Sequence, residues 1–598
     1  MAARRGPAAT VRKIVDYVVL GAGSAGCVMA NRLSEGGKRS VAVIEAGKFD
    51  IGRIDSWTIQ MPAALTYSVA DERYNWNYYT TPQKGLDGRS VHQPRGKVLG
   101  GSSSINAMVY VRGHALDFER WNESEGVSGW GYADVLPYFK RAQSFKSRDP
   151  DSDTDPSPYR GYEGPLKVTN YESPKSRTNV LFNVLEEAGA EAGYPVTKDT
   201  NGFMQEGFGP FDMTVDPDTG KRCSAAAAYL HPAMADPARK DKLDIFLETL
   251  VHRVIFETDK EDGAVPRAVG VECEDTKTGE IFHVMAEKEV ILCMGAVGSP
   301  QTLMLSGIGD RDQLTEQGIT DIIHHNPEVG KNLQDHLEVY LQYLCNLPVS
   351  LYPVAAWTVR HLHDRLGVGI EWFLRGTGVC ASNQFETGAF IRTDKGHKHP
   401  DIQYHFIPGC VVGQLEVLPH HGFQIHVGTL RPTSRGTIRL ASSDPKAAPL
   451  IDPNFLGTQQ DVDDMRKAVR LADELIQQPA FQPYKGKRHA PDPELDTQNV
   501  SKENDDAIDT WVRQSSHSAY HLSCTCAMGK VVDSHGAVYG TSNLRVVDAS
   551  IFPSITSGNL NSPTIMVAEK IAAHITGNEL APEHEEYYVP ADWETKQR

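Results

Sequence analysis

Cysteine is scarce in this chain. Nine cysteines occur among 598 residues, and they are scattered and odd in number. Disulfide-stapled scaffolds carry dense, even sets of cysteines, so this composition excludes that class. We therefore expect the protein to work in a reducing compartment.

Long apolar runs and an excess of positive charge are also missing. No uninterrupted apolar stretch reaches the roughly 20 residues of a membrane-spanning helix. Sixty Lys and Arg against 77 Asp and Glu give a formal net charge of -17. That sign disfavours a phosphate backbone, so we expect no nucleic-acid partner. With 40% hydrophobic residues the chain can still bury a large core, and length alone predicts about four domains.

Both ends of the chain have distinctive compositions. Residues 1–13 hold four basic residues and no acid, which resembles a short organellar presequence; an ordinary frayed terminus is the alternative. Residues 579–598 are polar and contain Pro582 and Pro590, so they are expected to form a C-terminal surface extension. The polar stretch 146–164 is expected to be a surface loop.

A glycine-rich turn follows the first apolar segment. Residues 16–20 (DYVVL) are typical of a buried strand, residues 21–26 read GAGSAG, and the next segment has a helical pattern. A second strand at 41–44 ends in Glu45, whose carboxylate could accept hydrogen bonds from a ribose. This order predicts a dinucleotide site in which backbone N–H groups approach a pyrophosphate. It leaves NAD and FAD both open, and a glycine turn without ligand is the structural alternative. The predicted contacts are Gly21, Gly23, Ser24, Ala25, Gly26 and Glu45.

A second glycine-serine segment carries a family resemblance. Residues 94–114 (PRGKVLGGSSSINAMVYVRGH) place small residues between apolar flanks. This segment resembles the first signature of the glucose-methanol-choline (GMC) family of FAD-dependent alcohol oxidoreductases. A second signature appears at 295–309, where Thr302 replaces a usual aliphatic residue. Later family segments are recognisable at 329–336, 519–521, 547–550 and 561–564, so the match runs from about residue 15 to about residue 575.

The resemblance implies the fold class and the domain organisation. The expected fold is α/β, with a Rossmann-like FAD-binding domain of GMC type and an interleaved α+β substrate-binding domain. The FAD-binding domain would comprise 14–175, 225–335 and 535–578, and the substrate-binding domain 176–224 and 336–534. Two interleaved domains thus replace the four that length suggests.

The resemblance also implies the cofactor contacts. FAD is the expected cofactor, and Ile105 occupies the position where a few members attach it through histidine, so non-covalent binding is expected. The further positions that would contact FAD are Gly100, Gly101, Ser102, Asn106, Ala107, Val251, Asp548, Ala549 and Thr564.

Several segments, including 73–80 and 399–408, are most similar to choline-oxidising members of the family. The implied reaction is oxidation of choline to betaine aldehyde, the first step of glycine betaine synthesis. A histidine suits removal of the hydroxyl proton near neutral pH, and the resemblance makes His521 that base. It places Asn561 at the second catalytic position, with Asn559 a weaker candidate.

A quaternary ammonium is best held by aromatic faces and a carboxylate. The candidates are Trp76, Tyr520 and Glu386, each of which could instead be an ordinary structural residue. His517, His521, Cys524 and Cys526 have spacings that could suit a metal, but Cys-x-Cys is awkward for one tetrahedral site, and we expect none.

The electron acceptor and the location rest on the resemblance alone. They are expected to be a quinone and the mitochondrial inner membrane, with peripheral attachment; oxygen and the cytoplasm are the alternatives. Three other functions stay open: oxidation of a different primary alcohol, a non-redox lyase or decarboxylase activity, and flavin binding without turnover.

Overall fold

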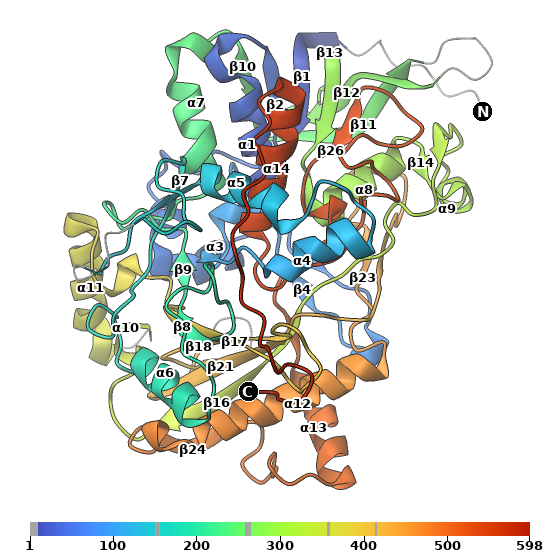
Figure 1. Ribbon diagram of the computed structural model, residues 1–598. Helices are drawn as coiled ribbons and strands as arrows, with labels where there is room; N and C mark the ends of the chain where they lie inside the picture. Colours follow the sequence, from blue (N-terminus) through green and yellow to red (C-terminus); the bar gives the residue numbers. More distant parts are fainter. Residues whose placement is uncertain (1–9, 150–151, 153–155, 258–264, 356–358, 413–415) are drawn as a thin grey trace.

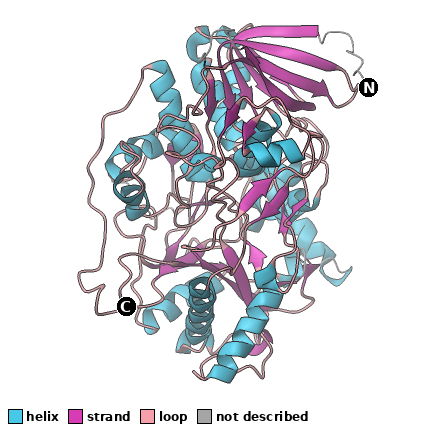
Figure 2. Cartoon of the chain, turned by 90° about the vertical axis from the view of Figure 1, so that its right-hand side faces the viewer, coloured by secondary structure: helices cyan, strands magenta, loops and turns pink. Residues whose placement is uncertain are grey.

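The computed structural model describes residues 10–149, 152, 156–257, 265–355, 359–412 and 416–598 (Figure 1). Two large sheets lie in different parts of the molecule, and helices cover both of them (Figure 2). None of the helices in these described ranges has the length and apolar composition needed to cross a bilayer.

The first sheet has seven strands in the order β10-β2-β1-β13-β12-β11, with β26 also paired to β13. Strands β10, β2, β1, β13 and β26 are parallel, and β12 and β11 continue the sheet antiparallel. Their bounds are β1 Thr10–Leu20, β2 Val41–Ile44, β10 Leu243–Phe246, β11 Thr249–Glu257, β12 Arg267–Asp275, β13 Ile281–Leu292 and β26 Leu544–Val546.

Helices α1 (Ser24–Leu33) and α14 (Asn561–Thr576) pack together against this sheet, although more than 500 residues separate them. The end of β1 is apolar without alternation because both of its faces are covered. The turn into α1 depends on glycine: a Cβ at Gly26 would lie 1.9 Å from the carbonyl oxygen of Gly21. The strand, the turn and the helix thus form the predicted dinucleotide-binding unit. Helices α5 (Tyr132–Ala142) and α8 (Gly295–Leu305) complete this half.

The second sheet is antiparallel, in the order β24-β16-β21-β18-β17-β8, with β25 also paired to β16. Helices α6 (Leu181–Glu191), α12 (Gln459–Ile476) and α13 (Lys502–Ser515) pack against it around a separate core. Its strands are β8 Gly207–Pro210, β16 Leu337–Cys345, β17 Thr387–Ile391, β18 Ile402–Ile407, β21 Gly422–Thr429, β24 Lys485–Ala490 and β25 His517–Ser518.

The remaining elements are short, apart from α11 Leu362–Arg375. The helices are α2 Trp57–Gln60, α3 Leu65–Ala70, α4 Ala115–Glu119, α7 His231–Ala235, α9 Arg311–Glu316 and α10 Tyr352–Ala355. The strands are β3 Tyr78–Tyr79, β4 His92–Gln93, β5 Val109–Tyr110, β6 Gln143–Phe145, β7 Leu166–Val168, β9 Asp212–Met213, β14 Ile308–Gly309, β15 His324–His325, β19 Val411–Val412, β20 Glu416–Val417, β22 Thr437–Arg439 and β23 Leu450–Asp452.

The expected α/β fold, with an interleaved second domain, matches this arrangement. Strands of the first sheet come from the segments assigned to the FAD-binding domain, and strands of the second from those assigned to the substrate-binding domain. The N-terminal boundary needs correction, because β1 begins at Thr10, which pairs with Phe282. A presequence that ended at residue 13 would therefore include part of the central sheet. Residues 1–9 lie outside the described residues.

The C-terminal segment 579–598 is mostly exposed, as expected, but it contacts both halves of the molecule. The N–H of Glu583 donates to the carbonyl of Ala133 just after α5 begins, and the guanidinium of Arg392 donates to the carbonyl of Lys596. In Figure 1 the segment, in dark red, runs from α14 down to the region of α12.

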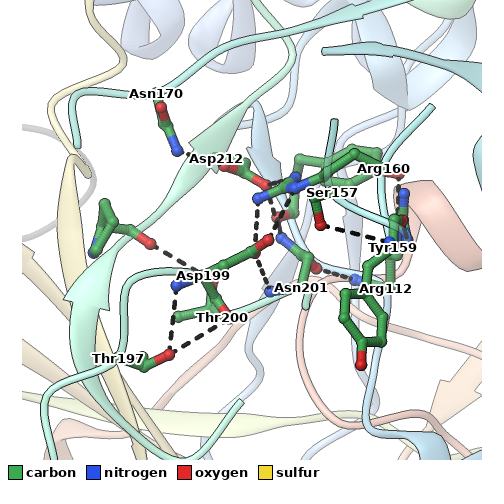
Figure 3. Close-up of polar contacts among 12 residues, drawn as sticks. Arg112, Ser157, Tyr159, Arg160, Asn170, Thr197, Asp199, Thr200, Asn201 and Asp212 are labelled. Atoms are coloured by element: carbon green, nitrogen blue, oxygen red, sulfur yellow. Dashed lines mark hydrogen bonds and ion pairs between the residues drawn. The ribbon is translucent and has the colours of Figure 1, made fainter. Parts of the chain in front are cut away.

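Part of the expected surface loop 146–164 is buried. The guanidinium of Arg160 is 4% exposed and pairs with Asp199 and Asp212, while Asn201 donates to the Asp212 carboxylate (Figure 3). Breaking such a buried pair would leave an uncompensated charge, so Arg160 anchors the end of the loop. The polar composition of residues 146–164 could not predict the burial of Arg160, because exposed polar residues and this buried arginine lie in the same stretch.

Candidate active site

One cavity of about 520 Å³ brings together most of the residues singled out in the sequence. Residues from the glycine turn, the glycine-serine segment, α8, the segment after β25 and the start of α14 line it. Among the predicted cofactor contacts, Gly26 and Gly100 do not line the cavity. Those that do are Gly21, Gly23, Ser24, Ala25, Glu45, Gly101, Ser102, Asn106, Ala107, Val251, Asp548, Ala549 and Thr564.

Glu45 lies at the dinucleotide end of the cavity. Its carboxylate accepts hydrogen bonds from the N–H of Ala22 at 2.9 Å and from that of Gly47 at 2.8 Å. Burial raises the pKa of Glu45 to about 7, against the lowering effect of these donors. Each oxygen keeps acceptor capacity, so the side chain can bind ribose hydroxyl groups.

Arg222 binds the glycine-serine segment through hydrogen bonds. Its guanidinium is 5% exposed and donates to the carbonyl and the side-chain oxygen of Asn106, both at 2.7 Å, and to the carbonyl of Ser103. These bonds fix the backbone that faces the cavity beside Ile105. Asp548 fixes the start of α8 in a similar way, because its carboxylate accepts from the N–H of Gly295 and from the hydroxyl of Ser299.

Two observations test whether the cavity fits FAD. Apart from its chain neighbours, the nearest protein atom to a Cβ built at Gly23 would be the carbonyl oxygen of Cys293 at 3.9 Å, which leaves room against the glycine turn for a ligand. Arg95 lines the cavity and is half-buried; its Nε and Nη2 atoms are buried, yet they have no hydrogen-bond partner in the part of the chain that the structure describes. Buried guanidinium N–H groups need acceptors, and the carbonyl oxygens and ring nitrogens of a flavin can supply them. The residues therefore fit the expected cofactor.

His521 is 9% exposed and lies between two polar neighbours. Its Nδ1 atom is 3.0 Å from Nδ1 of His336, and its Nε2 atom is 3.2 Å from the amide nitrogen of Asn559. Burial, together with the nearby imidazoles and Arg95, holds the pKa of His521 well below its usual range. The imidazole is therefore neutral, as a general base requires.

The hydrogen bonds assign the tautomer of His521. Nε2 of His336 lies 3.2 Å from the carbonyl oxygen of Leu430, which can only accept, so this nitrogen carries the proton. Burial lowers the pKa of His336 to about 4, so its Nδ1 is unprotonated and accepts from Nδ1–H of His521. Nε2 of His521 is consequently unprotonated, and it accepts a hydrogen bond from the amide N–H of Asn559.

The two asparagines considered for the second catalytic position have different neighbours. The amide of Asn559, not that of Asn561, lies beside Nε2 of His521. Gln403 and His405 point donors at the Asn559 side-chain oxygen, which orients its NH₂ group toward His521. Asn561 begins α14, and its side-chain oxygen instead accepts from the hydroxyl of Ser24 on the glycine turn, at 2.7 Å. Both asparagines line the cavity, and only their neighbours distinguish them.

Asp335 fixes the backbone at the base. One carboxylate oxygen accepts from the N–H of His521 at 2.7 Å and the other from the hydroxyl of Ser518 at 2.5 Å. Tyr520 between them has a φ of 66°, which is rare for an aromatic residue and is sustained by this bonding. Burial raises the pKa of Asp335 to about 6.

Two of the three expected cation-binding residues line the cavity, namely Trp76 and Tyr520. The third, Glu386, does not, and this corrects the expectation. Its side chain is fully buried, and its oxygens accept from the N–H and hydroxyl of Thr178 and from the hydroxyl of Ser382. A carboxylate occupied in this way serves the local structure.

Sequence reasoning missed Glu338, a buried carboxylate on β16 that, like Glu386, is not among the residues lining the cavity. It accepts from the hydroxyl of Tyr340 at 3.0 Å and lies 3.4 Å from Nδ1 of His426. Burial opposes its ionisation, but these neighbours and His405 hold its pKa below the usual range. Its negative charge is one cause of the raised pKa of Tyr520, after burial. The family segment 329–336 ends two residues before Glu338, and continuing along the strand would have identified it.

The metal alternative on residues 517–526 finds no support in the geometry. The ring of His517 stacks on Tyr340, and Cys524 and Cys526 are buried. Within the described ranges, the three metal-ligating side chains whose ligand atoms converge are His535, His574 and Glu579, outside the cavity lining.

Comparisons with known proteins identify the family of the chain. Family models described as GMC oxidoreductase match residues 15–338 and 432–568. The chain is 48% identical to human mitochondrial choline dehydrogenase, covering 94% of this chain and 90% of that protein. It is 44% identical to an oxygen-dependent choline dehydrogenase of Pseudomonas syringae pv. tomato, covering 98% and 97%. A solved FAD-dependent oxidoreductase from Chaetomium thermophilum superposes with a TM-score of 0.80 at 26% identity, over 94% of this chain and 99% of the other. The chain therefore belongs to the GMC oxidoreductase family.

Proposed function

We propose that the protein oxidises choline to betaine aldehyde with FAD as cofactor, the step that opens glycine betaine synthesis. The observation that carries this proposal is the unprotonated Nε2 of His521, which accepts from Asn559 in a cavity lined by the dinucleotide turn. Relatives named choline dehydrogenase, similar over nearly the whole chain, support the choice of alcohol.

In this reaction FAD, when bound, supplies the hydride acceptor. Nε2 of His521 accepts the hydroxyl proton of the alcohol, because it is unprotonated and its Nδ1–H is already bonded to His336. The amide N–H of Asn559 donates to the oxygen on which negative charge develops. Gln403 and His405 keep that amide in the donating orientation.

The trimethylammonium group of choline would be held by the aromatic faces of Trp76 and Tyr520 and by the charge of Glu338. Glu338 takes the role first considered for Glu386, because its charge acts on Tyr520 of the cavity wall, whereas the oxygens of Glu386 accept from Thr178 and Ser382. A carboxylate that stays ionised while buried lowers the free energy of a bound cation more than an exposed one would.

Non-covalent binding of FAD is part of the proposal. Ile105 lines the cavity, and its aliphatic side chain cannot form a bond to the flavin. Acid or heat treatment is expected to release all of the flavin into the supernatant. Flavin that stays with the denatured chain would contradict this.

A quinone is the proposed electron acceptor, with peripheral attachment to the mitochondrial inner membrane. The mitochondrial name of the human relative supports the location. The Pseudomonas relative is named for oxygen, which keeps oxygen and the cytoplasm as alternatives. Rates of flavin reoxidation by a soluble quinone and by oxygen, measured on the same reduced enzyme, distinguish the acceptors.

Anaerobic flavin bleaching tests the proposed activity. Choline is expected to bleach the flavin of the holoenzyme, and benzyl alcohol and glucose are not. Bleaching by one of the other alcohols would change the substrate. No bleaching by any alcohol would favour a lyase, a decarboxylase or a non-catalytic flavin protein.

A further inference from the structure

Helix α11 presents apolar side chains to solvent. Leu362, Leu366, Ile370, Phe373 and Leu374 are between 49% and 78% exposed. Their spacing of three and four residues places them on one face of the helix. Surface helices of globular proteins normally turn such a face inward, so this arrangement is reversed. The helix lies at the outer edge of the molecule, beside α10 (Figure 1).

The opposite face of α11 fixes the helix to the protein. Trp372 is 4% exposed, its indole N–H donates to the carbonyl of Gly220 at 2.7 Å, and it packs in a small core with Met61 and Cys380. Phe373 is in edge contact with Trp57. Because Trp372 already provides the packing that holds the helix, the exposed apolar face is not needed for folding. Contiguous exposed apolar surface of this kind marks an interaction site.

The charges around this face indicate the partner. Arg360 precedes the helix and Arg375 ends it, and both are exposed. The acids on α11 have local partners: Asp364 lies within about 3 Å of His361 and His363, and Glu371 accepts from Thr377. An apolar stripe between exposed arginines complements a bilayer that has anionic headgroups, and it stands out in a chain whose formal charge is -17.

We infer that α11 is a docking helix that lies in the surface of an anionic phospholipid bilayer. Its apolar face would enter the boundary between headgroups and acyl chains, and its arginines would contact phosphates. Tyr67 on α3 accepts a hydrogen bond from Arg365 and extends the same edge with an aromatic ring suited to that boundary.

The docking face is close to the wall of the active-site cavity. Tyr67 and Val69 both belong to α3, and Val69 lines the cavity. Docking through α11 therefore brings this wall near the membrane, where a lipid-soluble electron acceptor would be available. Docking through α11 deepens the peripheral attachment proposed above, and the link to the electron acceptor rests on the proposed function.

Vesicle flotation of the holoenzyme tests the inference. Wild type is expected to float with phosphatidylcholine vesicles that contain phosphatidylglycerol, and to float less with phosphatidylcholine alone or in high salt. L366S/I370S/L374S should lower the bound fraction by about tenfold or more, because it removes three apolar contacts with the acyl region. R360E/R375E should weaken binding only to the anionic vesicles. The matched control V265S/L450S/V500S replaces three exposed apolar residues elsewhere and should bind as wild type does.

Equal flotation of wild type and L366S/I370S/L374S would overturn the inference. So would a wild-type dimer that becomes a monomer in this variant without any vesicle binding, because the face would then join two copies of the chain. Flavin content and choline bleaching of every variant verify that the fold is intact. Bleaching also distinguishes the two proposals. Wild-type protein that floats with vesicles but is not bleached by choline would contradict the proposed function and would still support docking.

Discussion

The Nδ1 atoms of His521 and His336 lie 3.0 Å apart, and this contact sets which nitrogen of His521 carries a proton. The carbonyl of Leu430 fixes the proton on the far side of His336, so His521 must donate through Nδ1. The residue that sets the tautomer of the base is therefore His336, which follows Asp335 in the chain, and not a carboxylate.

Removal of the base should abolish most of the reaction. His521→Gln is expected to slow flavin reduction by choline by about 10²–10⁴-fold, because no group is left to take the hydroxyl proton. His336→Ala should cost less, since it loosens only the tautomer and orientation of the base. Anaerobic stopped-flow measures both. An H521Q variant that reduces flavin at the wild-type rate would remove His521 from the mechanism.

The pH dependence should reflect the lowered pKa of His521. The reaction needs the unprotonated imidazole, and a lowered pKa keeps it unprotonated to lower pH. The acid limb of kcat/KM is therefore expected below the ordinary histidine pKa of about 6.5. An acid limb at or above that pH would contradict the assignment, provided that kcat/KM is measured with an alcohol that does not itself titrate.

The two asparagines should respond differently to substitution. Asn559→Ala is expected to reduce kcat by about 10²–10³-fold with normal flavin content, because it deletes a donor to the developing charge. Asn561→Ala loses only the bond with Ser24 and should leave kcat within a few-fold of wild type. Equal losses in the two variants, measured on flavin-replete protein, would show that the distinction is unfounded.

Glu338 should determine the preference for a cation. Glu338→Gln is expected to raise the KM for choline by about ten- to a hundredfold, because a buried charge pair is lost. The KM for 3,3-dimethylbutan-1-ol, which has carbon in place of the ammonium nitrogen, should change little. Glu386→Gln is the matched control, since it alters a buried carboxylate whose oxygens accept from Thr178 and Ser382 and whose charge does not act on Tyr520. A rise in choline KM for E386Q but not E338Q would restore the earlier assignment.

Acid should destabilise the protein through its buried histidines. Burial lowers the pKa of His114, His336 and His405 to about 4 each. Between about pH 6.5 and 4 the unfolded chain binds protons that the folded chain refuses, so stability falls as pH falls. Urea unfolding midpoints should decrease across this window, less steeply in His336→Asn. A parallel slope in that variant would show that His336 does not contribute.

The sequence predicted the dinucleotide unit well, because its requirements are local. The order of strand, glycines, helix and Glu45 is read within 30 residues, and the structure reproduces it. The catalytic pair was harder to predict. Asn559 and Asn561 are two residues apart, and only the start of α14 decides which one faces His521. Glu338 could not be found from its neighbours in the sequence, because the histidines that keep it ionised, His405 and His426, come from β18 and β21.

The C-terminal segment has a mechanical consequence. It joins the chain near α5, beside the first sheet, to Arg392 and to Glu474 of α12, beside the second. The two halves cannot rotate apart as rigid bodies unless the contacts of this C-terminal segment break. Choline and products are therefore expected to pass through small movements of side chains and loops around Trp76 and Tyr520, and truncation of residues 583–598 should make the halves separate more readily.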